Sequence, residues 1–567
     1  MYTYTDFDKQ FVRQRAAQYR DQLQRNLAGQ LGDDEFRPLR LQNGWYIQRH
    51  APMLRIAVPY GELNSTQMRA LAHIAREFDR GYGHFTTRQN LQFNWIPLTR
   101  SADVMDALAA VDMHGIQTSG NCIRNITSDC FAGVAADEMV DPRPYCEILR
   151  QWSTLHPEFA FLPRKFKIAV TGAHEDRAAI AWHDIGLQLL KNDAGDVGIK
   201  VLVGGGMGRT PVIGTVVHEF LPWQQMLVFI EAIVRVYNRY GRRDNMYKAR
   251  IKILVKAEGQ KFIDDVNEEF RNILERDLDG SAHIVTQAEF NRVSSHFRLP
   301  AGVKPRASAT TSLQVPADAT PAFRRWLERN VHAHQLAGYR AVTLSLKRAG
   351  QAPGDATDRQ MELAADLADR YSAGELRVSH DQNLVLPWVR EADLPALYDA
   401  AKAASFATPN IGFLTDMIAC PGGDFCGLAN ARSIPIAAAI NERFDDLDEL
   451  YDIGDIDLHI SGCINSCGHH HSGHIGILGV DKDGSEWYQV TLGGLDGSAI
   501  SGGSAAGKVI GPSFAADEVV DVVEAVIDTY RHQRATDERF IDTVKRVGLD
   551  PFKTAANAQR RSTAQAA

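Results

Sequence analysis

The feature of this sequence that most restricts its fold is an internal repeat. The predicted order strand, helix, strand occurs twice, over residues 54–59, 65–80 and 85–96 and again over 342–347, 359–371 and 378–389. Gln89-Asn90-Leu91 in the first copy corresponds to Gln382-Asn383-Leu384 in the second. The simplest explanation is a duplication. It predicts two related lobes around a pseudo-twofold axis, with a crevice between them where a ligand could lie.

The repeat continues beyond these segments. Residues 170–172 match 460–462, and residues 183–186 match 473–476. Residues 208–214 resemble 507–512, and a helix is predicted after each, near 222–240 and 516–531. The duplication is therefore expected to extend over most of the chain.

Composition excludes several classes of protein. A net charge of -8 argues against a nucleic-acid partner, and no run of about 18 apolar residues predicts a membrane span. The first residues include an early acid and no apolar block, so no secretory signal is predicted and a cytoplasmic location is expected. A helix over 8–27 is rich in Arg and Gln and has only a weak apolar face. In the cytoplasm, clustered thiols usually bind metal or take part in redox chemistry.

Four of the seven cysteines form a pattern. Five residues separate Cys420 from Cys426, and three separate Cys463 from Cys467. Glycines surround both pairs and would let backbone N–H groups approach cluster sulfurs, so the pattern predicts a [4Fe-4S] cluster on these four thiolates.

Two other interpretations of the cysteines are less favoured. Structural zinc usually has two-residue gaps between paired cysteines, and a disulfide is disfavoured in the cytosol. Cys122, Cys130 and Cys146 are expected to be ordinary buried thiols. The neighbouring histidines are interpreted as turn residues and hydrogen-bond donors rather than metal ligands; they are His469, His470, His471 and His474.

Basic residues form a second group. Arg88 lies on the polar face of the strand expected over 85–96, and Arg124 precedes a glycine-containing segment. Lys165 and Lys167 are two apart at the start of a predicted strand and so share one face. Two such lysines repel each other unless an anion lies between them, although a solvated strand end would also explain them.

The glycine-rich run 204–208 is not interpreted as a dinucleotide loop. Pro211 and a strand-like segment follow where a helix should begin. No other flavin or nicotinamide motif is found, so electrons are expected to come from a separate donor protein.

The cysteine spacing, the duplication, the Thr87-Arg88-Gln89 strand, the Arg124-Asn125 pair and the 164–167 segment together resemble the sirohaem-containing sulfite and nitrite reductases. The resemblance covers about residues 52–548 and is closest to the haemoprotein (beta) subunit of assimilatory sulfite reductases. It implies an α+β class: an internally duplicated nitrite/sulfite reductase fold, with ferredoxin-like half-domains plus two α/β lobes around a central sirohaem.

The resemblance also implies the domain boundaries. They are an N-terminal extension (1–50), a ferredoxin-like half-domain (51–122), a sirohaem and substrate lobe (123–298), a linker (299–322), a second half-domain (323–410), an iron–sulfur and sirohaem lobe (411–549) and a disordered tail (550–567).

Site residues follow from the same resemblance. Cys420, Cys426, Cys463 and Cys467 would hold the cluster, and Cys467 would also bridge to the sirohaem iron. Arg88, Arg124, Lys165 and Lys167 would surround the substrate anion, and further contacts to the carboxylate-rich sirohaem are expected from Arg164, Arg209, Asn465 and Lys508. The segment 124–130 is expected to correspond to 420–426, and 165–177 to 455–467, so that one lobe keeps cysteines and the other keeps cations.

The implied function is six-electron reduction of sulfite to sulfide in sulfur assimilation and cysteine biosynthesis. A lysine at position 167, where plant-type nitrite reductases tend to have asparagine, favours sulfite, a dianion, over nitrite. Assimilatory nitrite reduction is the alternative, and a non-catalytic iron–sulfur electron-transfer protein is a remote one. The donor could be a ferredoxin or an NADPH-dependent flavoprotein.

Overall fold

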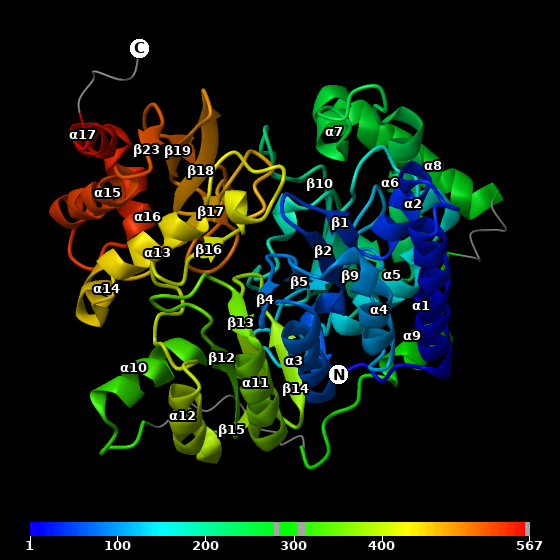
Figure 1. Cartoon of the computed structure of the whole chain (residues 1–567), viewed down its shortest axis with the longest axis horizontal. Coiled ribbons are helices and arrows are strands. Elements are labelled where there is room, and N and C mark those ends of the chain that lie inside the picture. The colour runs from blue at the N-terminus through cyan, green and yellow to red at the C-terminus, as the bar shows by residue number, and fades with distance from the viewer. Residues whose placement is uncertain (277–282, 304–312, 314, 562–567) are drawn as a thin grey trace.

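The computed structural model describes residues 1–276, 283–303, 313 and 315–561. Figure 1 shows two half-domains beside each other, with one lobe formed mainly by the cyan and green segments and another by the yellow to red segments. Each half-domain contains an antiparallel sheet, and each lobe contains a mixed sheet with helices packed on it. The predicted fold class, an internally duplicated α+β protein, agrees with this arrangement.

The first half-domain has the sheet order β1-β2-β5-β4-β13. Its own strands are β1 (Trp45–Ile47), β2 (Pro52–Ile56), β4 (Tyr82–Phe85) and β5 (Leu91–Phe93), with helices α3 (Ser65–Phe78) and α4 (Ser101–Ala109). Because β1 pairs with β2, this half-domain begins before residue 51, the boundary expected from the sequence.

The second half-domain has the order β11-β12-β15-β14-β3. Its own strands are β11 (Val331–His332), β12 (Tyr339–Leu344), β14 (Glu375–Val378) and β15 (Leu384–Arg390), with helices α10 (Pro321–Asn330), α11 (Asp358–Tyr371) and α12 (Leu394–Ala403). Apolar side chains of both half-domains form one continuous core.

The two half-domains exchange an edge strand. Strand β3 (Glu62–Asn64) belongs to the first copy but pairs with β14, while β13 (Asp355–Thr357) belongs to the second copy but pairs with β4. A capping box follows each exchanged strand: Asn64 and Gln67 bond each other's backbone N–H groups at the start of α3, as Thr357 and Gln360 do at the start of α11. The two copies are therefore interlocked rather than merely adjacent.

The single strand predicted over 85–96 is wrong. The chain turns between β4 and β5, where Thr86 and Asn90 share a backbone hydrogen bond and Gln89 has φ of 56°. The second copy turns in the same way, with Gln382 at φ of 61°. No glycine marks either turn, so the sequence pattern continued as one strand. Arg88 consequently lies in a tight turn rather than on the face of a sheet.

The lobes repeat one topology. The first has the order β10-β9-β8-β7-β6 and the second β16-β17-β18-β19-β22, and the three strands nearest one edge are parallel in both. The first lobe has β6 (Thr127–Ser128), β7 (Ile168–Thr171), β8 (Ile185–Lys191), β9 (Val197–Val203), β10 (Thr215–Pro222) and α6 (Met226–Tyr240). The second has β16 (Ile418–Ala419), β17 (Leu458–Ser461), β18 (Ile475–Lys482), β19 (Ser485–Leu492), β22 (Lys508–Val509) and α15 (Val519–Gln533).

The ends of the chain are more ordered than predicted. Residues 550–558 form helix α17 (Asp550–Ala558), whose Phe552 and Ala556 are fully buried in the core of the second lobe, so the disordered tail predicted from 550 is wrong for this part. Helix α1 (Asp6–Leu27) packs on α4 through Val12, Tyr19 and Leu23. Residues 304–312, 314 and 562–567 of the predicted linker and tail lie outside the described residues. No helix in the described ranges has the length and apolarity to cross a membrane.

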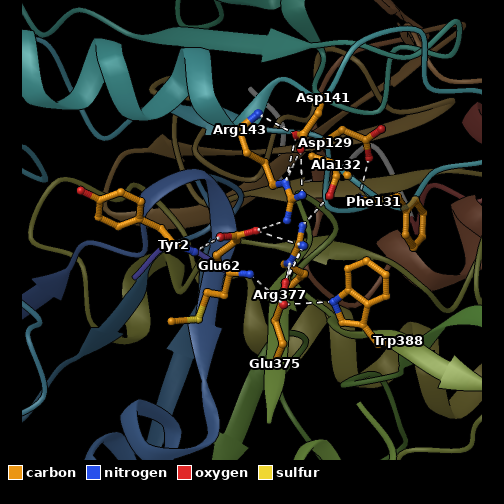
Figure 2. Close-up of polar contacts among 12 residues, drawn as sticks. Tyr2, Glu62, Asp129, Phe131, Ala132, Asp141, Arg143, Glu375, Arg377 and Trp388 are labelled. Atoms are coloured by element: carbon orange, nitrogen blue, oxygen red, sulfur yellow. Dashed lines mark hydrogen bonds and ion pairs between the residues drawn. The ribbon is translucent and has the colours of Figure 1, made fainter. Parts of the chain in front are cut away.

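A buried charge network lies where the exchanged strand β3 joins β14 (Figure 2). Arg377 is fully buried and contacts Glu62 at 3.0 Å and Glu375 at 2.5 Å. Arg143 from α5 (Arg143–Ser153) also reaches Glu62, at 3.0 Å, and the N-terminal ammonium of Met1 lies 3.1 Å from Glu375. Although burial opposes it, Arg377 and this ammonium hold the pKa of Glu375 well below its usual value. The network thus links the N-terminus, both half-domains and the first lobe.

Replacing Arg377 with Met should lower the free energy of unfolding by about 3–5 kcal/mol, because Glu62 and Glu375 would remain buried with less compensating charge. Denaturant unfolding followed by circular dichroism measures the effect. The matched Arg76→Met change removes exposed pairs with Asp358 and Glu362 and should shift the midpoint far less, because solvent screens them. Equal shifts for the two variants would contradict this assignment.

Candidate active site

The four cysteines follow two adjacent parallel strands. Cys420 comes directly after β16, and Cys463 comes one glycine after β17. Because β16 and β17 are parallel, their carboxyl ends meet at one edge of the sheet. Cys426 and Cys467 lie in the loops that continue from these ends. The structure therefore gathers both pairs at one edge.

Glycines allow the two cysteine loops to approach. The Gly462 N–H donates to Cys420 Sγ at 3.2 Å, and a Cβ on Gly462 would lie 2.6 Å from the Gly422 Cα. A Cβ on Gly468 would lie 1.9 Å from the Ile460 carbonyl oxygen. Any larger residue at either position would separate the loops, which is the physical reason for the glycines seen beside the cysteines.

The environment of the thiols suits a cluster. Asn465 Nδ2 lies 3.5 Å from Cys463 Sγ, and Ser433 Oγ lies 3.6 Å from Cys420 Sγ, so polar groups already surround the sulfurs. Burial and the neighbouring Cys467 raise the pKa of Cys420 to about 12, and burial also raises the pKa of Cys426 and of Cys463. Such thiols become thiolates readily only when positive metal charge compensates them.

The arrangement differs from a site for one metal ion. Within the described ranges, no three His, Cys, Asp or Glu side chains are disposed to hold a single ion. A cubane places one thiolate on each of four irons, so its ligands need not converge on one point. The donor set and the surrounding N–H groups therefore fit a [4Fe-4S] cluster, whereas the geometry disfavours the zinc alternative.

The four predicted cations lie together in the first lobe and half-domain. Arg88 donates to Thr127 Oγ1 at 2.9 Å and to the Asn125 carbonyl at 2.6 Å, and Arg124 donates to the carbonyls of Thr118 and Gly120. Among the described residues, none of Arg88, Arg124, Lys165 and Lys167 has a carboxylate within 4.0 Å in an ion pair. Each keeps part of its surface accessible, as expected of groups that line a cavity.

These cations depress one another's pKa values. Burial and Arg124 lower the pKa of Arg88 to about 9. Burial, Arg88 and Lys165 lower the pKa of Lys167 well below its usual value, and burial and Arg124 lower that of Lys165. Four cations that lie close together without carboxylate partners favour the binding of an anion, because the anion would relieve their mutual repulsion.

Contacts of the first half-domain and the first lobe with the second lobe bring the cations to the cysteines. Thr87, beside Arg88, donates through Oγ1 to the Cys467 carbonyl at 2.9 Å. His471 Nε2 lies 2.9 Å from the Gly208 carbonyl oxygen. The Cys467 thiolate also acts against the depression of the Lys165 and Lys167 pKa values, which places it within electrostatic reach of both. The predicted cluster residues and the predicted anion residues thus form one site.

The four residues predicted to contact sirohaem differ in their exposure and surroundings. Arg164 is half-buried, and burial and Arg124 lower its pKa, while Asn465 is exposed beside Cys463. Arg209 is exposed on a loop, and Lys508 is exposed on strand β22. Their roles toward a carboxylate-rich cofactor stay predictions.

Two basic residues of the site, Arg250 and Lys252, were not predicted from the sequence. Arg250 pairs with Asp184 at 2.7 Å, and Lys252 donates to the carbonyls of Gly206, Met207 and Thr210, so it holds the glycine-rich loop in place. Burial and Arg250 lower the pKa of Lys252 to about 7. The spacing Arg250-Ile251-Lys252, a basic pair two residues apart as in 165–167, was the available signal.

The correspondence of the two copies is partly corrected. Residues 170–172 and 460–462 occupy equivalent positions, because β7 pairs with β8 as β17 pairs with β18. Ser128 of β6 pairs with Val170 as Ala419 of β16 pairs with Ile460. The predicted match of 124–130 to 420–426 is therefore wrong by five residues, and Asp129 rather than Arg124 is the counterpart of Cys420.

Interlocked half-domains, related lobes, and four cysteines beside an uncompensated group of cations define a duplicated iron–sulfur protein with an anion site. Comparison with known protein families identifies the family within this class. Residues 119–274 and 413–563 match the "Nitrite and sulphite reductase 4Fe-4S domain", and residues 46–111 and 334–404 match the "Nitrite/Sulfite reductase ferredoxin-like half domain". The chain belongs to the nitrite and sulfite reductase family.

Some of the similar proteins are named as sulfite reductases and others as nitrite reductases. The chain is 27% identical over 499 residues to sulfite reductase [ferredoxin] 1 of Mycolicibacterium paratuberculosis, covering 86% of this chain and 81% of that one. It is 28% identical to the ferredoxin–nitrite reductase of Synechococcus elongatus over 78% of this chain and 80% of that one. The solved structure of Mycobacterium tuberculosis NirA has the same fold, with a TM-score of 0.74, 24% identity and coverage of 94% of each chain.

The family, the duplicated fold and the cofactor prediction are thereby confirmed. The reductases of this family carry sirohaem and a [4Fe-4S] cluster, and the chain is an oxidoreductase of the sulfite and nitrite type. The individual site residues predicted above remain predictions, supported by their geometry.

Replacing Gly462 with Ala should remove most of the bound iron and acid-labile sulfide, because the new Cβ would press on the Gly422 backbone and separate the cysteine loops. Iron and sulfide analysis of purified protein measures this. Gly427→Ala is the matched control in the same region, since its Cβ would meet neighbours no closer than 3.5 Å. Full cluster content in Gly462→Ala would show that the close approach is not required.

Proposed function

We propose that this protein is an assimilatory sulfite reductase that reduces sulfite to sulfide with six electrons. The observation that carries the proposal is Lys167, a second lysine beside Lys165 in the uncompensated cation group. A dianion offsets the repulsion among these charges more completely than a monoanion does. Nitrite reduction is the alternative, because relatives named for nitrite are as similar to this chain as those named for sulfite.

The four cations have two proposed tasks. Arg88 and Arg124 hold the oxygens of the anion, because guanidinium groups stay charged and present several donors. Lys165 and Lys167 supply protons as S–O bonds break, because their depressed pKa values make proton release easier. The sirohaem and the cluster, when bound, would supply electrons and the iron at which the anion reacts.

A ferredoxin is the proposed electron donor. The sequence contains no nucleotide-binding motif of its own, and the relatives named above are ferredoxin enzymes. An NADPH-dependent flavoprotein, the other donor expected from the sequence, has no support among these relatives.

Lys167→Asn should lower kcat/KM for sulfite by about tenfold or more, equivalent to ~1.4 kcal/mol, and lower that for nitrite less, because the monoanion depends less on the second lysine. Steady-state assays with both anions and reduced ferredoxin measure this. Lys200→Asn, at a lysine on β9 paired with Glu219, is the control and should change neither value. Equal losses for both anions would remove Lys167 as the selector, and a wild-type preference for nitrite would overturn the sulfite proposal.

The pH dependence of sulfite reduction should also report Lys167. Its pKa is depressed, so it loses its proton at a lower pH than an ordinary lysine, and kcat/KM should fall as pH rises through that value. Lys167→Arg keeps its positive charge at higher pH, so the decrease in kcat/KM should shift to higher pH, while proton transfer should become slower. An unchanged pH profile in Lys167→Arg would show that another group controls the fall.

A further inference from the structure

A cavity of about 670 Å³, separate from the site described above, lies where the second half-domain meets both lobes. Exposed Glu328 and Ala136 lie at its edge, and buried His380 and His469 form its inner wall. It contains none of the four cluster cysteines and none of the four cations of the site described above.

The duplication makes this cavity the counterpart of the anion site. Asp381 precedes Gln382 in its turn as Arg88 precedes Gln89. Asp455 and Asp457 precede β17 as Lys165 and Lys167 precede β7. All three aspartates line the cavity. Thus three cations of one copy are replaced by three carboxylates in the other.

The cluster ligands are replaced as well. The counterparts of Cys420 and Cys467 are Asp129 and Arg177, which form an ion pair at 2.8 Å, and the counterpart of Cys463 is Ala173. The cavity therefore lacks these cluster thiolates, and its carboxylates would repel a carboxylate-rich tetrapyrrole. Its ligand must be of the opposite charge to that of the anion site.

Part of the negative charge in the cavity is uncompensated. Arg177 pairs with Asp137 and Glu175, Arg329 pairs with Asp455, and Lys347 pairs with Asp416. Within the described residues, no cation forms an ion pair with the Asp381 carboxylate within 4.0 Å, since Lys347 donates to the Asp381 main-chain carbonyl and pairs with Asp416 instead. The nearest ionisable partner of Asp457 is His474, at 3.8 Å. Burial lowers the pKa of His474 to about 4, so this ring is neutral near pH 7. Burial and Asp416 in turn raise the pKa of Asp381 to about 7.

An unpartnered histidine on the inner wall points independently to a ligand. His380 is 7% exposed and lines the cavity, yet neither ring nitrogen has a hydrogen-bond partner among the described residues. Asp457 Oδ2 likewise has no hydrogen-bond partner there. A buried imidazole without partners is unfavourable, and a ligand with N–H groups would satisfy its acceptor nitrogen.

The size and walls of the cavity select the kind of cation. No three carboxylate, thiol or imidazole groups of the described chain converge on a point, and the volume far exceeds that of one ion. Ile411, Ile418 and Val331 provide apolar wall between the acids. We propose that this cavity binds a small organic polycation, an aliphatic diamine or polyamine, with its ammonium groups at Asp381 and Asp457 and its methylene chain along the apolar wall.

Calorimetric titration of the purified, cofactor-loaded protein tests the proposal, with putrescine and spermidine as probes and 1,4-butanediol as an uncharged control. We expect saturable binding of an amine with one site per chain and no binding of the diol. Asp381→Asn and Asp457→Asn should each weaken binding by about tenfold or more. Asp193→Asn, at an exposed aspartate away from the cavity, should leave the affinity unchanged.

Three results would overturn the proposal: no saturable binding of either amine, equal affinity in the two cavity variants and the wild type, or binding of Zn²⁺ or Mn²⁺ but not of an amine. Thermal unfolding of each variant verifies that it is folded, and both substitutions preserve side-chain size. The titration involves no electron donor and no sulfite, so its failure would leave the proposed reductase function standing.

Discussion

Two glutamine amides hold the duplicated halves in register. Gln89 donates to the carbonyls of Ser128 and Val378, and its own oxygen accepts from the Ser128 N–H. Gln382 does the same across the axis, with the Phe85 and Ala419 carbonyls and the Ala419 N–H. Each side chain therefore satisfies both functions of its amide inside the protein, in a place where an unpaired amide would be strongly unfavourable. The positions of the charged residues that precede them, Arg88 and Asp381, depend on these bonds.

Much of this organisation was predictable. The repeat, the cysteine spacing and the basic pairs could be predicted because they are patterns in the sequence. The glycines beside the cysteines could also be read from the sequence as sites where the backbone approaches closely. The turn at 86–90 was not predictable, because tertiary bonds from Gln89 rather than a local glycine stabilise its φ of 56°. The five-residue error in matching the two copies has the same origin, since only the pairing of β6 and β16 fixes their register.

Other differences between the prediction and the structure occur where tertiary packing, rather than the local sequence pattern, determines the conformation. The segment 550–558 is polar and rich in small residues, yet Phe552 anchors it as a helix on the second lobe. The weak apolar face of α1 suffices because only a few side chains, Tyr19 and Leu23 among them, enter the core. Lys252 joins the site through three carbonyls that are more than 40 residues away in the sequence. Such long-range contacts leave no periodic signal.

The exchanged edge strands have a consequence for synthesis on the ribosome. Strand β4 at residues 82–85 pairs with β5 on one edge, but its other edge finds its neighbour only when residues 355–357 have been made, and β3 waits for β14 until residues 375–378 have been made. Until then the nascent first half presents an open strand edge, the kind of surface on which chains aggregate. The first half cannot complete its sheet as an independent unit, so the ordinary order of folding, domain by domain from the N-terminus, is not open to this chain. Its expression should therefore depend strongly on chaperones that shield the early half until the later one emerges.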